Sequence, residues 1–215
     1  MPEKLKDCRS SEAIPAELLI VEGDSACSSV DSVRDKSFQA VLPIQGKPLN
    51  PIRANRAKVA EHPFYQAIVG AIGAGWDEEF DLSKSRYERV VLVFDPDADG
   101  IHCSMLVLMF FYRWMRPLLE AGRVHLVRAP LVQITFDGAS ELICTDDEDF
   151  ATREVSKLKA AGKTNVVKKR FRGLGSMSPD VLAHYCVNPG TRQSNSLTIA
   201  DAEAAIAVFS PQKRL

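Results

Sequence analysis

Short apolar runs recur along the first part of the chain and predict the strands of a sheet. They cover residues 17–21, 38–44, 89–94 and 124–128, and a Gly or Pro lies close behind each of them. Runs of this length that are rich in apolar and β-branched residues are typical of buried strands. The segment RVVLVF, at residues 89–94, is the clearest example.

Helical periodicity fills most of the sequence between these runs. It predicts helices over about residues 25–33, 54–60, 64–73 and 101–119, and Gly122 is a typical C-terminal cap for the last of them. Strands that alternate with helices imply an α/β fold with a parallel sheet flanked by helices. Ligands of such sheets bind outside the carboxyl ends of the strands.

From about residue 131 the pattern changes. Runs at 131–136 and 141–144 predict a hairpin, and a charged helix follows over 147–161. A basic segment, VVKKRFRGLG, then leads to a tail over 178–209 that is mostly helical. We therefore expect three parts: a polar lead-in over 1–15, an α/β domain over 16–130, and a mostly helical extension over 131–215.

Bulk composition does not identify a function. The 215 residues include 27 Lys and Arg against 28 Asp and Glu, so the formal net charge of −1 gives no argument for nucleic acid. A DNA-binding face would need local segregation of charge. Five cysteines without a C-x-x-C pair argue against a zinc site or a disulfide framework. Without a signal-peptide pattern or a long apolar run, we expect a cytoplasmic protein with no membrane partner.

An acidic cluster directly follows the clearest predicted strand. Asp95, Asp97 and Asp99 stand at alternate positions of DPDADG, and Glu22 ends an earlier predicted strand. The carboxyl ends of parallel strands meet at one edge of the sheet, so these four residues can converge. Carboxylates so close together repel one another unless a cation lies between them. Mg²⁺, which binds a few carboxylates beside phosphate, fits this pattern.

Two other interpretations fit parts of the acidic cluster. A solvated acidic turn is a common outcome for an arbitrary D-x-D. DPDADG also matches the first half of an EF-hand calcium loop, with Gly100 at the sixth position. The twelfth position holds Leu106 instead of Glu, however, and the preceding segment is strand-like, so the EF-hand is disfavoured. Glu22 after one strand and D-x-D-x-D-G after another make a divalent-metal site the more specific interpretation.

Further segments around the carboxylates make a family resemblance specific. In chain order they are LIVEGDSA (19–26), FQAVLPIQGKPLN (38–50), FFYR (110–113), APL (129–131) and RFRGLGSM (170–177). Together with the acidic cluster they resemble the TOPRIM domain of type IIA DNA topoisomerases, in the branch that contains the B subunits of DNA gyrase and topoisomerase IV. The resemblance covers about residues 4–209 and implies a Rossmann-like sheet flanked by helices.

The resemblance implies a role for each matching residue. Glu22 would act as general acid/base and metal ligand, and Asp95, Asp97 and Asp99 would hold one or two Mg²⁺ ions, for which Mn²⁺ can substitute. Asp24, Ser25 and His102 would support the site. The residues implied to contact the DNA backbone are Lys47, Lys168, Lys169, Arg170 and Arg172. From charge pattern alone, a solvated face is an equal alternative for the basic run.

Several parts of a working type II topoisomerase are not recognisable in the sequence. It contains no G-x-x-x-x-G-K-[ST] loop, hence no ATP site of that kind, and none of its four tyrosines matches a known nucleophile context. The resemblance therefore implies a cleavage half-site for double-stranded DNA. It would act with a gyrase A-like cleavage subunit that bears the tyrosine, and with a separate ATPase module.

Two alternatives stay open. The surroundings of the carboxylates depart from the usual family pattern, for example at Asp31, Ser104 and Ser176, where lysine, arginine and glutamate are common. These departures favour a free-standing, non-catalytic paralogue that binds DNA or a topoisomerase subunit and regulates it, although an excised piece of a larger subunit also fits. A hydrolytic nuclease that uses the same metal site is the other alternative.

Overall fold

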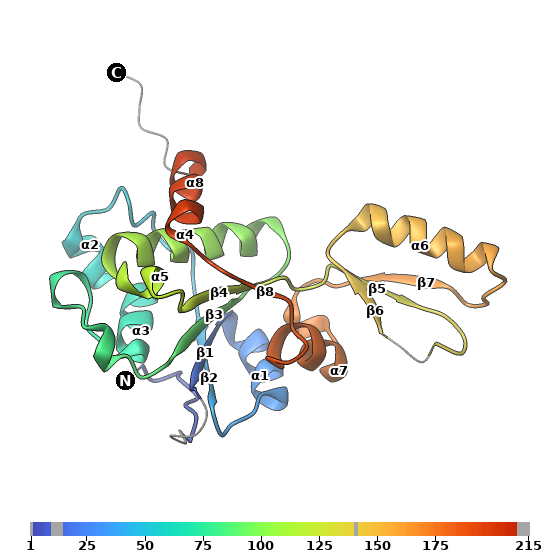
Figure 1. Ribbon diagram of the computed structural model, residues 1–215, viewed down its shortest axis with the longest axis horizontal. Coiled ribbons are helices and arrows are strands. Elements are labelled where there is room, and N and C mark those ends of the chain that lie inside the picture. Colours follow the sequence, from blue (N-terminus) through green and yellow to red (C-terminus); the bar gives the residue numbers. More distant parts are fainter. Residues whose placement is uncertain (1, 10–14, 140–141, 210–215) are drawn as a thin grey trace.

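A five-stranded sheet forms the centre of the protein, whose computed structural model describes residues 2–9, 15–139 and 142–209 (Figure 1). The strand order is β2-β1-β3-β4-β8. The first four strands pair in parallel, and β8 pairs antiparallel with β4. The strands are Glu17–Glu22 (β1), Gln39–Ile44 (β2), Arg89–Val93 (β3), Val124–Val127 (β4) and Ser194–Ser196 (β8).

Helices cover both faces of this sheet (Figure 1). They are Gly23–Val33 (α1), Arg56–Glu61 (α2), Pro63–Ile72 (α3), Ala98–Trp114 (α4), Pro117–Glu120 (α5), Pro179–Leu182 (α7) and Ile199–Phe209 (α8). Short 3₁₀ turns occupy Asp77–Glu79 (η1), Leu82–Lys84 (η2) and Leu174–Ser176 (η3), and a π-helical turn occupies Ala183–Val187 (η4). α3 and α4 pack on one face of the sheet, α1 and α7 pack on the other, and α8 lies across α4.

Alternate side chains of the central strands enter two separate cores. On β1, Leu18 and Ile20 pack on the side of α3 and α4, while Leu19 and Val21 pack on the side of α1 and α7. All four are fully buried, and burial of each such side chain contributes about 1.5–3 kcal/mol. Strands that are covered on both faces have continuous apolar runs, which is why the sequence pattern marks them so clearly.

Residues 131–171 form an arm that projects from this body (Figure 1). Its antiparallel sheet has the order β6-β5-β7, with strands Val132–Thr135 (β5), Ile143–Thr145 (β6) and Val167–Arg170 (β7). One helix, Glu148–Ala160 (α6), packs on it around a small core of Val132, Ile134 and Ala151. Among the described residues, the other face of the arm sheet has no such helix.

The predicted α/β sheet flanked by helices is confirmed, but several details differ. The helix expected from residue 101 begins at Ala98, and it ends at Trp114 because Pro117 starts the separate helix α5. The tail predicted as mostly helical contains β8, whose polar sequence SNS provided no strand signal. In the predicted hairpin, Glu141 lies outside the described residues. The domain boundaries remain predictions.

The segment 2–9, expected to be a polar lead-in, lies against the body. Lys6 forms an antiparallel bridge with Val41 at the outer edge of β2. Lys4 and Lys6 form ion pairs with Asp24 and Asp31 of α1, at 2.8 and 3.0 Å. The segment therefore covers part of a sheet edge whose backbone groups would otherwise be free to pair with another chain.

A buried ion pair joins the C-terminal part of the chain to the start of β1. Arg192 donates hydrogen bonds of 2.7 and 2.9 Å to the two carboxylate oxygens of Glu17, and Gln39 donates a third of 2.9 Å. Burial would raise the pKa of Glu17, but the hydrogen bonds from Arg192 and Gln39 outweigh it and hold that pKa below its ordinary value. Loss of Arg192 would leave the buried Glu17 carboxylate with the Gln39 hydrogen bond and a longer ion pair, at 3.5 Å, to the partly exposed Arg89. None of the described helices has both the length and the apolar character needed to cross a membrane.

Candidate metal centre

The parallel register of β1 and β3 brings two acidic residues to the same edge of the sheet. Val21 pairs with Val93, so Glu22 and Asp95 each follow closely on the last paired position of their strand. Glu22 ends β1, and Gly23, with φ +78°, turns the chain sharply into α1. A backbone with positive φ at this point favours glycine. The local sequence thus places Glu22 at the carboxyl edge, as expected from the strand pattern.

The start of α4 places the other two aspartates. Asp97 is the N-cap of α4, and its Oδ1 accepts a 2.9 Å hydrogen bond from the Gly100 N–H. Asp99 lies in the first helical turn and is exposed. The three aspartates, at alternate positions of the sequence, therefore do not lie on one extended segment, because α4 begins at Ala98. Gly100 lets the helix approach the loop before it, because an added Cβ there would lie 2.1 Å from the Asp95 carbonyl oxygen.

Asp95 is held by a segment far away in the sequence. The backbone N–H of Leu174, in η3, donates a 2.8 Å hydrogen bond to Asp95 Oδ1. Gly173 lies against the other oxygen, since an added Cβ at Gly173 would be 2.4 Å from Asp95 Oδ2. One oxygen of Asp95 is thus fixed by the protein.

The four carboxylates interact electrostatically. Burial, followed by the charges of Asp95, Asp97 and Asp99, raises the pKa of Glu22 above its ordinary value. Burial also raises the pKa of Asp95, and the charge of Asp97 adds to this, while the hydrogen bond from Leu174 opposes it. Within the described chain, no ion pair involves any of the four. A cation between them would therefore relieve repulsion that no described ion pair balances.

The four side chains do not yet form a closed set of ligands. Across the described residues, no three His, Cys, Asp or Glu side chains converge closely enough to hold an ion as they stand. The donors nevertheless suit a hard divalent cation, because all are carboxylates and Asp95 and Asp97 each keep one oxygen outside the hydrogen bonds that fix them. The side chains of Glu22 and Asp99 make no hydrogen bond within the described chain that would fix them in their present positions.

Lys47 is a cation at the same edge of the sheet as this group. It follows β2 at the same edge of the sheet, where Ile44 pairs with Glu22, and its side chain is exposed. Burial and the charges of Glu22 and Asp99 raise the pKa of the Cys103 thiol to about 11, and the charge of Lys47 opposes the rise. The charges of Lys47 and of the acidic residues therefore act on the same group, the Cys103 thiol.

The three residues expected to support the site, Asp24, Ser25 and His102, contact other parts of the chain. Asp24 accepts hydrogen bonds from Lys4 and Gln45, and the former lowers its pKa, so its charge is already paired. Ser25 lies against Gly175, where an added Cβ would be 2.7 Å from the serine Oγ. His102 stacks on Phe209 of α8, with ring centres 5.1 Å apart. None of the three roles is tested by these contacts, and they stay predictions.

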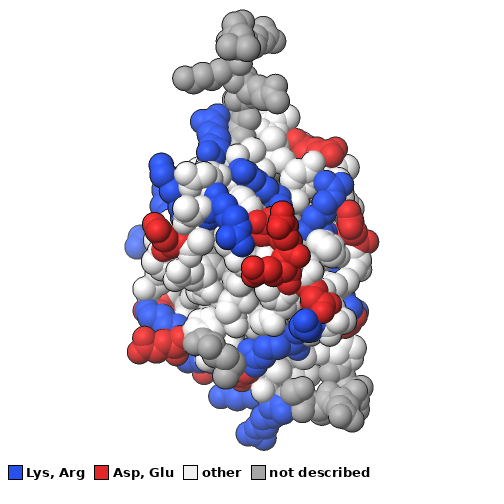
Figure 2. Space-filling view, turned by 90° about the vertical axis from the view of Figure 1, so that its left-hand side faces the viewer, with Lys and Arg blue, Asp and Glu red and all other residues white. Residues whose placement is uncertain are grey.

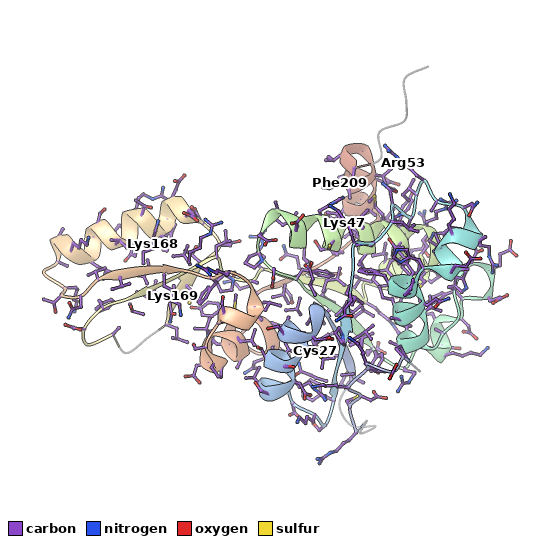
Figure 3. The ribbon with its side chains drawn as sticks, turned by 180° about the vertical axis from the view of Figure 1, so that it is seen from behind. Cys27, Lys47, Arg53, Lys168, Lys169 and Phe209 are labelled. Carbon is purple, nitrogen blue, oxygen red and sulfur yellow. The ribbon has the colours of Figure 1, made fainter. Side chains whose placement is uncertain are left out.

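The basic run on β7 divides into two groups (Figure 3). Lys168 and Arg170 face α6, where both pair with Glu148, the first at 3.8 Å. Lys169 points to the opposite side of the arm sheet, and its Nζ lies 5.9 Å from the centre of the Phe171 ring. Arg172, just beyond the strand, is exposed. In the described chain, neither Lys169 nor Arg172 takes part in an ion pair.

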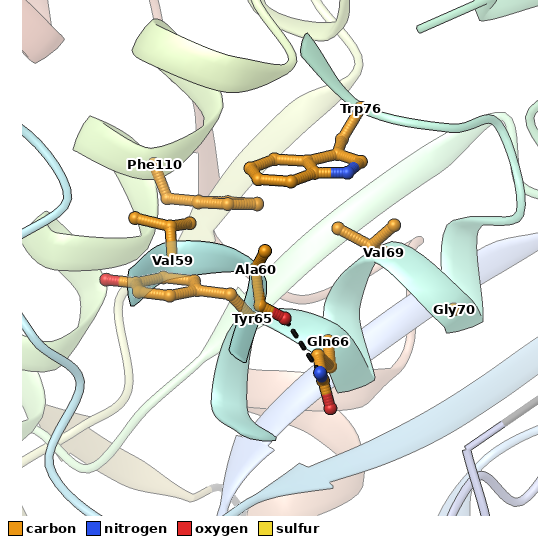
Figure 4. A pocket seen from close by; sticks show the side chains of 8 residues that line it. All are labelled: Val59, Ala60, Tyr65, Gln66, Val69, Gly70, Trp76 and Phe110. Carbon is orange, nitrogen blue, oxygen red and sulfur yellow. Dashed lines mark hydrogen bonds between the residues drawn. The ribbon is translucent and has the colours of Figure 1, made fainter. Parts of the chain in front are cut away.

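Two cavities show where small groups could enter the molecule. One of about 230 Å³ lies beneath Trp76, with Tyr65 and Phe110 in its wall, and its lining is almost wholly apolar (Figure 4). It contains no carboxylate and is separate from the acidic cluster. The other, of about 240 Å³, lies between the body and the arm and includes Asp95 and Asp146 in its lining. Of the two, the second alone adjoins the proposed metal ligands.

Comparison with known proteins agrees with this geometry. The model of the Toprim domain matches residues 17–129, just over half of the 215 residues, including both strand ends that bear the carboxylates. The chain belongs to the Toprim domain family. The match stops close to where the arm begins, so it covers the central sheet up to β4.

Relatives extend the similarity of this Toprim chain over its arm and tail. The B subunit of DNA gyrase from Archaeoglobus fulgidus is 41% identical over 210 residues, that of Haloferax volcanii 40% over 211, and that of Thermotoga maritima 42% over 209. The alignments include 97–98% of this chain, and 32% of each relative. The Toprim chain therefore spans about a third of the length of these gyrase B subunits.

One feature of this Toprim site was not identified from the sequence. The Leu174 N–H that holds Asp95 lies 79 positions further along the chain, and a backbone group gives no residue-type signal. The close pair Gly173 and Gly175 was the available clue, since glycines often mark a close approach of the backbone to another group. That clue does not say which group is approached.

Mg²⁺ should stabilise this Toprim chain, and Glu22 should be needed for the effect. At free Mg²⁺ about 100 times its Kd, binding contributes about 2.7 kcal/mol, which raises the Tm of a chain of this length by roughly 5–10 °C. Glu22→Gln should lose most of this rise because it removes a charged ligand. Asp81→Asn, in an exposed loop and paired with Lys84, should keep it. Thermal unfolding followed by circular dichroism measures both.

The rise in Tm should also depend on pH. Since the pKa values of Glu22 and Asp95 are raised in the folded state, protons compete with Mg²⁺ as the pH falls through those raised values. Without metal, these two groups favour the folded state below their unfolded pKa, and that contribution is lost as the pH rises through the folded pKa. An equal Mg²⁺-dependent rise at about pH 7.5 and about pH 4.5 would contradict the assignment.

Proposed function

We propose that this chain supplies the Mg²⁺-binding DNA cleavage and religation site of a type II DNA topoisomerase. The observation that supports it best is the acidic edge of the sheet, where Glu22, Asp95, Asp97 and Asp99 interact and where no described ion pair brings a protein cation to any of them. Membership of the Toprim family and about 40% identity to gyrase B subunits give the reaction class its support.

Glu22 has the properties that a general acid/base needs. It is partly buried, and its raised pKa brings proton exchange nearer to neutral pH than for an ordinary carboxyl group. Asp95 and Asp97, each fixed through one oxygen, would hold Mg²⁺ with Asp99 in support; Mn²⁺ is an expected substitute. A bound Mg²⁺ would stabilise negative charge on the phosphate and the leaving oxygen. Glu22 would then give a proton to that oxygen in cleavage and take it back in religation.

The nucleophile is expected on a partner, because the tyrosines of this chain are engaged elsewhere. Tyr65 and Tyr87 are buried, and their hydroxyls donate to the Leu49 carbonyl and to Asp7. Burial raises the pKa of both. The Tyr112 and Tyr185 hydroxyls donate to Glu203 and to the Leu142 carbonyl. A gyrase A-like subunit that carries a tyrosine would complete the site.

The DNA backbone would be contacted by cations that form no ion pair within the described chain. Lys169 on the arm, Arg172 just beyond it and Lys47 on the body meet this condition, while Lys168 and Arg170 are paired with Glu148. At the end of the body remote from the arm, acidic and basic side chains are interspersed (Figure 2). That end offers no uniformly basic surface. Double-stranded DNA would therefore lie between the arm and the acidic edge, and strand passage would need a separate ATPase module.

Glu22 should be required for DNA cleavage in the reconstituted enzyme. With a gyrase A-like subunit, Mg²⁺ and plasmid, Glu22→Ala should lower the yield of protein-linked breaks by about 10²–10⁴-fold, the range for a lost general acid/base. Glu88→Ala, an exposed carboxylate before β3 at the opposite edge of the sheet, is the matched control and should cleave normally.

Three results would contradict the proposal. If Glu22→Ala cleaved as well as the wild type, the carboxylate would have no catalytic role. If the wild type bound DNA or its partner and never gave a protein-linked break, the chain would act as a regulator instead. Nicks without a linked protein would indicate a hydrolytic nuclease.

Neighbouring lysines on β7 should contribute unequally to DNA binding. Lys169→Ala should weaken binding to any duplex sequence and lower the slope of log Kd against log salt by about 1, as expected for one lost phosphate contact. Lys168→Ala removes the same charge from a residue paired with Glu148, so it should change the slope much less. Fluorescence anisotropy over a salt series measures both. Equal effects would mean that the pairing does not select between them.

A further inference from the structure

We infer that the turn at residues 172–176 is a positioning device for the metal ligand Asp95. The inference rests on the proposed function, because it concerns how this chain prepares the same acidic edge for Mg²⁺. Its basis is the juxtaposition of one backbone N–H and two glycines against the strand-end segments, in a turn that the Ser176 hydroxyl closes internally. The turn is supplied by the C-terminal part of the chain, outside the region that the Toprim model matches.

The contact between the turn and Asp95 uses both carboxylate oxygens. Leu174 N–H donates to Oδ1 at 2.8 Å, so rotation of the carboxylate would break a hydrogen bond to a charged acceptor. Gly173 approaches Oδ2 so closely that an added Cβ would lie 2.4 Å from it. Its backbone has φ +143° and ψ 175°, a conformation that is essentially restricted to glycine. Glycine is therefore required here for two separate reasons.

Two hydrogen bonds within the turn and one buried side chain hold it in place. Ser176 Oγ accepts a 2.9 Å hydrogen bond from the Arg172 N–H and donates one of 2.7 Å to the Gly173 carbonyl. Leu174 is fully buried in the core that lies under α1 and α7, so the turn cannot slide relative to the sheet. The N–H that meets Asp95 is thus presented from a fixed frame, as the hydrogen bonds of outer residues fix metal ligands in other sites.

A second contact extends the device to the other strand end. Gly175 lies against Ser25, three residues after Glu22. The turn therefore touches the segments that follow both β1 and β3. Repulsion among the carboxylates would drive Asp95 away from Glu22 and Asp97 when no ion is present, and the hydrogen bond from Leu174 resists that movement. The ligand set is held partly assembled, which lowers the cost of binding an ion.

The same turn continues directly from the arm. β7 ends at Arg170, and Arg172, which we place against DNA, donates its backbone N–H to the serine that holds the turn. A DNA-contacting residue thus stands only a short way along the chain from the group that fixes a metal ligand.

The direct test is the affinity of the whole chain for Mn²⁺ and Mg²⁺, measured by calorimetry. Gly173→Ala should raise the Kd by about 10–100-fold, the usual effect of losing a residue that orients a metal ligand. Gly162→Ala is the matched control: that residue also has positive φ, at +74°, but open space around its Cβ position. It should leave the Kd within about twofold of the wild type.

A second readout separates positioning from general damage to the fold. In a ¹⁵N-¹H spectrum of the metal-free chain, the Leu174 amide should shift strongly in Gly173→Ala and in Asp95→Ala, and stay in place in Gly162→Ala. Ser176→Ala introduces no clash and should raise the Kd several-fold if Gly173→Ala fails to fold. Ser156→Ala, which removes an exposed hydroxyl hydrogen bond within α6, is its control.

The outcomes distinguish this inference from the proposed function. A wild-type chain that binds neither Mn²⁺ nor Mg²⁺ overturns the metal site itself, and the positioning role with it. A wild-type chain that binds Mn²⁺, with an unchanged Kd in folded Gly173→Ala and in Ser176→Ala, overturns the positioning role alone. A raised Kd together with a displaced Leu174 amide in the Gly173 variant, but not in the Gly162 variant, supports it.

Discussion

Repulsion between carboxylates at one edge of a parallel sheet is the constraint around which this structure is organised. β1 and β3 pair in parallel, with Val21 opposite Val93, so Glu22 and Asp95 lie at the same edge of the sheet. Asp97 and Asp99 add two more charges at the start of α4. The fold keeps them there at a cost that is visible in the raised pKa values of Glu22 and Asp95. A cost of this kind persists at functional sites when the surrounding structure holds the strained groups in place.

The surrounding structure provides that support in three ways. The central strands are buried on both faces, which fixes their register and hence the relative position of the two strand ends. The buried pair of Glu17 and Arg192 fastens the C-terminal part of the chain to β1, at the end opposite to Glu22. The turn around Leu174 then reaches back to Asp95. Arm, tail and sheet edge thus form one connected unit.

The sequence was sufficient for the features that rest on local pattern. The apolar runs indicated strands β1 to β6, but not the basic strand β7. The residues after β1 and β3 indicated the carboxyl edge, and the combination of Glu22 with DPDADG indicated the candidate metal ligands. Pairings between distant segments were not predictable, because neither the ion pair of Arg192 with Glu17 nor the hydrogen bond of Leu174 to Asp95 leaves a periodic signal. The strand β8 was missed for a similar reason, since its polar residues pair only at the sheet edge.

Residues that depart from the family pattern have structural partners. Asp31 pairs with Lys6 and Arg34, so the reversed charge at this position is neutralised within the chain. Ser104 donates to the Ile101 carbonyl within α4, and Ser176 holds the turn beside Asp95. These contacts show that the altered surroundings are accommodated without loss of the carboxylates. They leave the acidic edge as the feature on which the proposed function rests.

The most direct measurement is the anomalous scattering of Mn²⁺ in crystals of the chain grown or soaked with the ion. We expect a peak bordered by Glu22, Asp95 and Asp97, with the hydrogen bond from Leu174 to Asp95 intact and the side chain of Glu22 turned toward the ion. A map with no peak at this edge, or with peaks only at other acidic residues, would contradict the assignment of these strand-end carboxylates as a metal site.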